Sequence, residues 1–205
     1  MYPAKPGLTI GFHGCDQSVR NRIVNGKVML KTSDNDYDWL GNGMYFWENN
    51  RQRALEFAQE LKKAPRQGQQ SIKTPAVLGA VIDMGFCLDL LDTEYLNLVK
   101  RSYNGLSNSY KQLGLQLPVN KNIGNSRDLL LRKLDCNVIE NLHYIRNKFP
   151  LQSFDSARGV FIEGNPLYAN AGFNEKNHIQ ICIRNPNCIK GFFIPRHVDP
   201  GFKIP

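Results

Sequence analysis

Gly-Asn-Gly-Met-Tyr-Phe-Trp, residues 41–47, is the stretch that decides the fold of this chain. Residues 44–47 form an apolar run that predicts a strand, and the two glycines before it predict a tight turn. The run leads into residues 50–63, whose apolar side chains recur at the spacing of one helix face. An earlier apolar run, residues 8–15, contains Gly-Phe-His-Gly and predicts another strand. The chain therefore opens with a strand that carries His-Gly, and a second strand follows Gly-x-Gly.

The rest of the chain predicts an α+β domain. Apolar or alternating runs predict further strands at residues 76–84, 157–163, 178–184 and 189–195. Helical patterns lie between the first two of these strands, at residues 93–103, 107–113 and 126–149. The expected architecture is a single domain over residues 1–205, with a mixed or antiparallel sheet as its core and a helical insert at about residues 92–150.

Length and composition also fit a globular domain. The 205 residues suit one core, and 41% of them are hydrophobic. No stretch reaches the roughly 18 consecutive apolar residues of a membrane span, and the first residues lack the apolar segment of a secretory signal. We therefore expect a cytoplasmic protein with no membrane partner. The five cysteines include no Cys-x-x-Cys pair, which argues against a disulfide framework and against a metal site.

The chain is basic, with a formal net charge of +8 and a pI near 9.3. A basic surface attracts polyanions. The positive residues are spread along the sequence, however, which is also typical of an ordinary solvated surface. Nucleic acid is therefore one open class of partner.

The two opening motifs resemble those of ADP-ribosyltransferases of the diphtheria-toxin and poly(ADP-ribose) polymerase type. The shared pattern is a strand with His-Gly, about thirty residues later Gly-x-Gly-hydrophobic-Tyr-Phe, and then a helix rich in alanine. The specific motifs lie in about the first sixty and the last fifty residues, and the helical insert matches nothing in the family. The resemblance implies an enzyme that binds NAD as a co-substrate and breaks the bond between nicotinamide and ribose.

The resemblance assigns roles to residues of both motifs. His13 would bind a ribose hydroxyl, the backbone of Gly14 would bind the carboxamide, and Tyr45 would stack on the nicotinamide ring. Gly43 belongs to the same NAD-binding pattern, and Phe57 would form a second wall of the nicotinamide pocket. Without the resemblance, these residues are a strand-end histidine, turn glycines and core aromatics.

The third position of the family's site departs from the common pattern. Many members carry a glutamate on a late strand, where it binds a ribose hydroxyl and stabilises the developing positive charge. Gln180 stands at the matching place in this chain, and an amide can bind the hydroxyl but brings no charge. Glu163 or Glu175 could supply that charge, and Glu163 is the better candidate because a strand holds its residues more rigidly than a loop. An exposed acid at a strand end is the alternative interpretation of Glu163.

Residues 164–177 form a loop rich in glycine and asparagine, at the place where the family presents a loop that recognises the target. Tyr168, Phe173 and Glu175 are expected to contact an acceptor, although a plain surface connection fits the sequence as well. Candidates for contacts with the NAD diphosphate, or else ordinary surface arginines, are Arg20, Arg51 and Arg158.

The expected function is NAD-dependent mono-ADP-ribosylation of a macromolecule, with nucleic acid slightly favoured over protein because of the basic charge. Small bacterial members of the family often act as toxins, paired with an antitoxin protein or serving in defence against phage, and the resemblance implies such a role. Two alternatives keep the same fold: hydrolysis of NAD, and transfer of an RNA 2′-phosphate to NAD. A third alternative is a non-catalytic module that binds NAD or ADP-ribose. This alternative stays open because Gln180 replaces the charged glutamate of the family.

Overall fold

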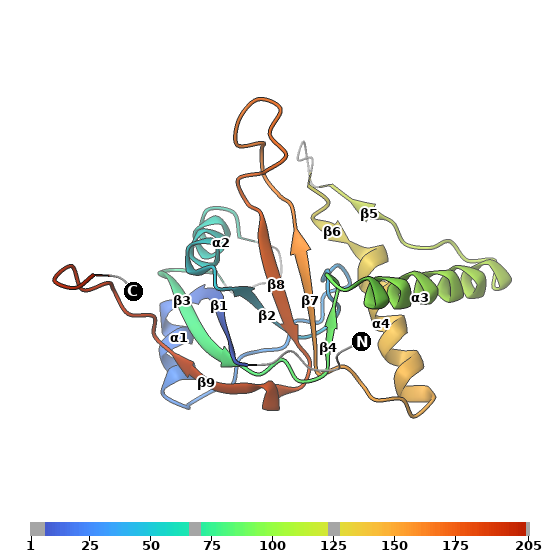
Figure 1. The fold of residues 1–205 in the computed structure, drawn as a ribbon, viewed down its shortest axis with the longest axis horizontal. Coiled ribbons are helices and arrows are strands. Elements are labelled where there is room, and N and C mark those ends of the chain that lie inside the picture. Colours follow the sequence, from blue (N-terminus) through green and yellow to red (C-terminus); the bar gives the residue numbers. More distant parts are fainter. Residues whose placement is uncertain (1–6, 66–70, 123–127, 204–205) are drawn as a thin grey trace.

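The computed structural model describes residues 7–65, 71–122 and 128–203. Its main strands are β1 (Thr9–Asp16), β2 (Met44–Glu48), β3 (Pro75–Ile82), β4 (Cys87–Asp89), β7 (Ser156–Phe161), β8 (His178–Ile183) and β9 (Ile189–Phe193). Within the described residues they form one seven-stranded sheet in the order β4-β7-β8-β2-β1-β3-β9 (Figure 1). Neighbouring strands are antiparallel except β4 and β7, which are parallel. The expected mixed α+β fold with one central sheet is confirmed.

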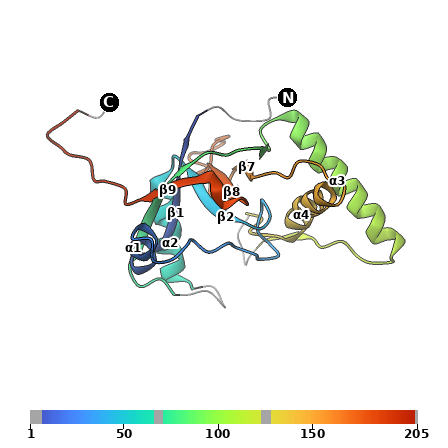
Figure 2. The same ribbon diagram turned by 90° about the horizontal axis from the view of Figure 1, so that it is seen from below.

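The helices in this part of the chain are α1 (Gln17–Val24), α2 (Arg51–Lys63), α3 (Thr93–Gln112) and α4 (Lys133–Lys148). Figure 2 shows α3 and α4 side by side at the β7 end of the sheet and α1 and α2 near β1. Both α1 and α2 also contact β3. Asp16 and Asn50 cap α1 and α2, because their side chains accept hydrogen bonds from main-chain N–H groups of the first turn. None of the described helices combines the length and the hydropathy that crossing a bilayer requires.

Both faces of the sheet are buried. On the first face, Phe46 and Leu78 pack with Ile23 of α1. Trp47 follows Phe46 and packs on the second face with Ala54 of α2, because successive side chains of a strand point to opposite faces. Farther along the second face, α3 and α4 complete the core over β4, β7 and β8. The buried residues there are Leu40, Leu88, Tyr95, Ile139, Leu142, Phe154, Ala157, Phe161 and Cys182.

The helical insert differs from the expectation in two ways. Residues 93–112 form one continuous helix, α3, that passes through Gly105. An exposed glycine inside a helix costs only about 1 kcal/mol relative to alanine, so Gly105 does not end it. The predicted helix 126–149 begins late, since α4 starts at Lys133, and its expected first residue lies outside the described residues.

A short ribbon explains the late start of α4. β5 (Asn120–Lys121) pairs with β6 (Leu131–Arg132) directly before the helix. The side-chain oxygen of Asn120 accepts hydrogen bonds from the main-chain N–H groups of Leu134 and Asp135. Asn120 therefore satisfies main-chain N–H groups in the first turn of α4 from a separate segment. The residues directly before the helix give no sign of this cap.

Candidate functional site

His13, Tyr45 and Gln180 lie on three neighbouring strands, β1, β2 and β8. In the β2–β8 ladder Trp47 stands opposite Gln180, and Tyr45 stands opposite Cys182. Tyr45 and Gln180 therefore point to the same face of the sheet, one step apart on adjacent strands. The side chains of His13, Tyr45 and Gln180 are all partly exposed. The sheet brings together residues that are far apart in the sequence.

His13 fills the place where β1 and β2 separate. The paired residues of the β1–β2 ladder end with Phe12 opposite Trp47. At the next position, Nδ1 of His13 lies 2.8 Å from the main-chain oxygen of Tyr45. Because a carbonyl oxygen only accepts hydrogen bonds, Nδ1 carries the proton and donates it.

The same environment keeps His13 neutral. Burial lowers the pKa of His13 below its ordinary value of 6.5, and the hydrogen bond to Tyr45 opposes this shift. In the neutral ring with a protonated Nδ1, Nε2 has a free lone pair and can accept a hydrogen bond from a hydroxyl.

His13 and Tyr45 project from opposite faces of the sheet. His13 stands opposite Leu78 in the β1–β3 ladder, and its ring lies 6.0 Å from that of Phe46; both neighbours belong to the first face. Tyr45 shares the second face with Trp47. A ligand that contacts both side chains therefore cannot lie flat on one face of the sheet.

The hydroxyl of Tyr45 is occupied by the turn that precedes β2. It donates to the main-chain oxygen of Gly41 at 2.7 Å and accepts from the N–H of Leu40 at 2.9 Å. Burial raises the pKa of Tyr45 well above its ordinary value of 10.0. The phenol therefore stays protonated, and only the ring is left to contact a ligand.

Close packing explains the glycines of both motifs. A Cβ atom on Gly14 would collide with the main-chain oxygen of Ala54, so α2 rests directly on β1 at this point. A Cβ atom on Gly43 would collide with Cys182 of β8. Both glycines have a packing role, whatever part their backbone plays in binding.

Phe57, the expected second wall of the nicotinamide pocket, packs against Trp47. Its ring is 4.9 Å from that of Trp47, and the two belong to the small core between α2 and the sheet. Phe57 therefore helps to fix α2 on the second face, on which Tyr45 and Gln180 also lie.

Glu163 is buried, with 5% of its surface exposed, so its interpretation as an exposed strand-end acid is wrong. The expectation that a strand holds Glu163 is wrong as well, because β7 ends at Phe161. Its carboxylate lies 3.7 Å from Nη2 of Arg53 and 3.9 Å from Nδ1 of His178. Burial raises the pKa of Glu163, and the charge of Arg53 opposes the shift. His178 is two residues before Gln180 on the same face of β8, a separation of roughly 7 Å along the strand. Glu163 is thus an acid close to Gln180 but one that is engaged with Arg53.

Glu175 has a structural task in the connection between β7 and β8. Its carboxylate accepts hydrogen bonds from the main-chain and side-chain N–H groups of Asn165. The main chain of the connection is also paired, with Leu167 N–H donating to the oxygen of Phe173 at 3.0 Å. The connection is therefore a hydrogen-bonded extension of the hairpin that projects beyond the sheet (Figure 1). Tyr168 and Phe173 lie in it, each 62% exposed.

Arg158 belongs to a buried ionic network that no sequence motif indicated. Nη2 of its guanidinium lies 3.0 Å from Oε1 of Glu48, and Nη1 lies 3.2 Å from Oδ1 of Asp89. Arg158 therefore joins β2, β4 and β7 and is not free to bind a diphosphate. The sequence feature that could have indicated this network is an arginine within a largely apolar strand, because a buried charge needs a partner of opposite charge.

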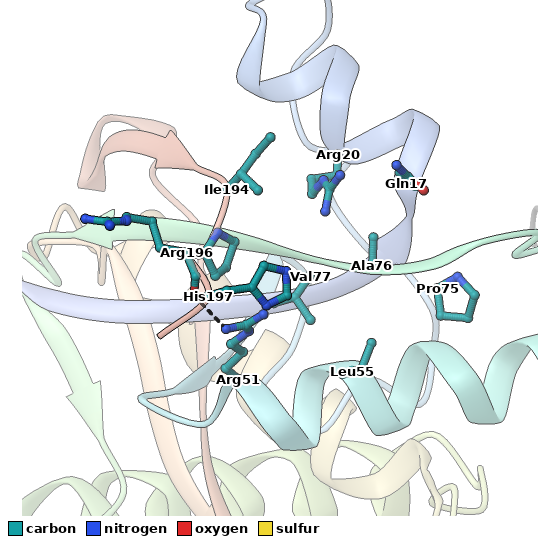
Figure 3. A pocket seen from close by; sticks show the side chains of 11 residues that line it. Gln17, Arg20, Arg51, Leu55, Pro75, Ala76, Val77, Ile194, Arg196 and His197 are labelled. Atoms are coloured by element: carbon teal, nitrogen blue, oxygen red, sulfur yellow. Dashed lines mark hydrogen bonds between the residues drawn. The ribbon is translucent and has the colours of Figure 1, made fainter. Parts of the chain in front are cut away.

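Arg20 and Arg51 meet at a pocket of about 530 Å³ at the edge of β3. They point into it from α1 and α2, with His197 between them (Figure 3). No sequence pattern linked the segment that follows β9 to these arginines. A second hollow, of about 490 Å³, lies beside Glu48 and His178.

The chain matches no protein-family model, no curated protein and no solved structure. Across residues 7–65, 71–122 and 128–203, no group of three or more His, Cys, Asp or Glu side chains is placed to hold a metal ion.

Proposed function

We propose that the protein is an NAD-dependent mono-ADP-ribosyltransferase that modifies a macromolecule. The observation that carries this proposal is the placement of His13, Tyr45 and Gln180 on three adjacent strands, although they lie near opposite ends of the sequence. The local motifs alone do not require this arrangement.

The reaction breaks the bond between the nicotinamide nitrogen and C1′ of the ribose, and the bonding electrons leave with nicotinamide. A nucleophilic atom of the acceptor then forms a bond to C1′ and releases a proton. Positive charge develops on the ribose, as in glycoside hydrolysis. An enzyme accelerates this step by orienting the ribose and by placing acceptors or negative charge near C1′.

The residues of the site suit the first of these tasks. Nε2 of neutral His13 can accept a hydrogen bond from a ribose hydroxyl, because Nδ1–H is already used by Tyr45. The side-chain oxygen of Gln180 can accept another. The ring of Tyr45 offers a rigid apolar surface for nicotinamide, since its hydroxyl is held by the preceding turn.

Glu163 is our candidate for the negative charge. It lies next to His178, two residues from Gln180, in a buried environment where a charge acts over a longer distance than in water. Arg53 compensates part of that charge at 3.7 Å. We assign Glu163 an electrostatic role and give the hydroxyl contact to Gln180.

One set of observations favours a second candidate, a non-catalytic module that binds NAD or ADP-ribose. Tyr45 and Gly14 are already used in packing, and His13 projects from the face opposite to Tyr45. A role as a bacterial toxin or defence effector, with or without an antitoxin partner, rests on the resemblance of the motifs.

The experiment that tests the proposal follows two labels of NAD, one in nicotinamide and one in the adenylate. The pure protein is incubated with each in a cell lysate, and the His13→Asn variant serves as the matched control. We expect release of nicotinamide and transfer of the adenylate label to a macromolecule, both lost in the variant. Nuclease or protease treatment of the product then identifies the class of acceptor. Binding of NAD without release of nicotinamide would establish the non-catalytic module instead.

A further inference from the structure

Basic side chains line the pocket between α1, α2, β3 and the segment after β9. They are those of Arg20, Arg51, Arg196 and His197, and among the described residues no acidic side chain lines this pocket. Arg20 donates to the side-chain oxygen of Asn21, and Arg51 donates to the main-chain oxygen of Arg196 at 2.9 Å. Both acceptors are neutral. Among the residues that the structure describes, neither guanidinium forms an ion pair.

Three other arginines near the sheet, in contrast, form ion pairs. Arg53, Arg158 and Arg184 each lie within 4 Å of a carboxylate. Two uncompensated guanidinium groups that face one pocket repel each other, and an anion between them removes that repulsion. A guanidinium also presents paired N–H donors that match the oxygens of a phosphate group.

The shape of the pocket follows from the sheet edge. β9 pairs with β3 only from Gly79 onward, so the edge of β3 at Pro75–Val77 is open to the pocket. Arg20 and Arg51 approach this edge from two helices, and the guanidinium of Arg196 is directed away from them (Figure 3). The volume of about 530 Å³ is large enough for one nucleotide unit.

We infer that this pocket binds a phosphate group of a nucleic acid, and that this nucleic acid is the acceptor. The second part rests on the proposed function, whereas the binding itself does not. The net charge of +8 favours a polyanion, since a basic protein attracts nucleic acid over its whole surface and a pocket of this kind then fixes one phosphate.

The diphosphate of NAD offers the same chemistry, but the packing of α2 argues for a separate ligand. Ala54 of α2 rests on Gly14 of β1, and β1 lies between β2 and β3. On the face that carries Tyr45 and Gln180, α2 therefore stands between these residues and the pocket. A ligand that stays on that face and contacts Tyr45 and Gln180 therefore reaches the pocket only by passing around α2, which a nucleic-acid strand of several nucleotides does more readily than a single NAD molecule.

The test measures binding of a fluorescent single-stranded RNA of about 20 nucleotides to the full chain, without NAD, at several salt concentrations. The double variant Arg20→Gln/Arg51→Gln is compared with Arg22→Gln/Arg101→Gln, which removes the same charge from two exposed positions outside the pocket. Loss of two phosphate contacts should lower the affinity about tenfold and reduce the slope of log K against log salt by about 1.4. The control pair should change the slope much less.

Equal losses of RNA affinity in the two double variants would overturn the inference, because binding would then depend on the net charge of the protein and not on the pocket. Competition with ADP-ribose distinguishes the source of the phosphate: if ADP-ribose binding but not RNA binding depends on Arg20 and Arg51, the pocket belongs to a free nucleotide and the inference is wrong. Arg51 also donates a hydrogen bond to the main-chain oxygen of Arg196, so its loss could weaken binding by displacing that segment. The single variant Arg20→Gln leaves this bond in place and therefore controls for such a structural effect. Because no NAD is present, failure here leaves the proposed reaction untouched, and its own assay reports on it separately.

Discussion

Nδ1 of His13 lies 2.8 Å from the main-chain oxygen of Tyr45, at the point where the ladder between β1 and β2 has ended. This bond holds two strands together and selects one tautomer of the imidazole. The structural role of His13 therefore belongs to Nδ1, and the chemical role that we propose belongs to Nε2.

The two roles can be separated by replacing His13 with asparagine. The amide N–H of His13→Asn can still donate to the oxygen of Tyr45, but no acceptor remains at the place of Nε2. We expect the melting temperature to change little, whereas the rate of nicotinamide release falls about 100-fold. Calorimetry and an NAD-cleavage assay measure the two quantities. His13→Ala, which loses both contacts, should lose stability as well as activity; an active His13→Asn would remove His13 from the proposed mechanism.

A second prediction concerns the contact between α2 and β1. Gly14→Ala places a methyl group against the main-chain oxygen of Ala54, and main chain cannot move aside as a flexible side chain can. We expect a loss of about 2–3 kcal/mol in the free energy of unfolding. The matched change Gly105→Ala lies in α3, where an added Cβ meets nothing within 4 Å. It should stabilise the protein by about 0.5–1 kcal/mol. Denaturant unfolding of both variants checks the difference in sign.

Local chemistry made the ends of several elements predictable. The helix expected at residues 50–63 agrees with α2 because local chemistry marks its start: the side chain of Asn50 accepts a hydrogen bond from the main-chain N–H of Arg53. The apolar run at residues 76–84 likewise predicted a strand, and β3 is buried along most of its length. The expected break between residues 103 and 107 was wrong, because Gly105 interrupts the helical pattern of the sequence but does not end α3. β4 was missed because its three residues are too short to show a period.

The candidate site was only partly predictable, because its geometry depends on strand pairing. Whether Gln180 stands opposite Trp47 or one residue farther along decides which face it occupies, and no local pattern specifies this register. The opposite orientations of His13 and Tyr45 have the same origin. The ionic network of Arg158 and the pocket of Arg20 and Arg51 each join segments from distant parts of the chain.

A third prediction is that the protein loses stability in mild acid. Burial lowers the pKa of His143 and of His178 from 6.5 to about 4, so each is neutral in the folded state and takes up a proton on unfolding. Between pH 6.5 and 4 the unfolded state binds more protons, and the free energy of unfolding therefore falls as the pH falls. Each histidine should contribute on the order of 2 kcal/mol across this range. Thermal melts from pH 4 to 8 measure the slope.

The pH effect can be assigned with a substitution at His143, whose ring packs edge-on against Phe154. His143→Phe keeps an aromatic ring there and removes the titrating group, so the slope between pH 4 and 6.5 should become shallower. An unchanged slope in His143→Phe would mean that His143 titrates alike in the folded and the unfolded protein, and would contradict this prediction.

The last prediction concerns the charge at the third position. Gln180→Glu keeps the size of the side chain and adds a carboxylate next to the place where the ribose becomes positive, so we expect nicotinamide release to accelerate about tenfold. Glu163→Gln removes the charge that we assign to that task and should slow the reaction by a similar factor. If charge is what matters, the double variant should recover most of the rate that Glu163→Gln alone loses. Gln180→Ala is the reference for loss of the hydroxyl contact without any charge, and melting curves of all four variants control for the fold. A Gln180→Glu protein as slow as Gln180→Ala would mean that this position needs an amide donor, and the role of Gln180 as a substitute for the family's glutamate would then be wrong.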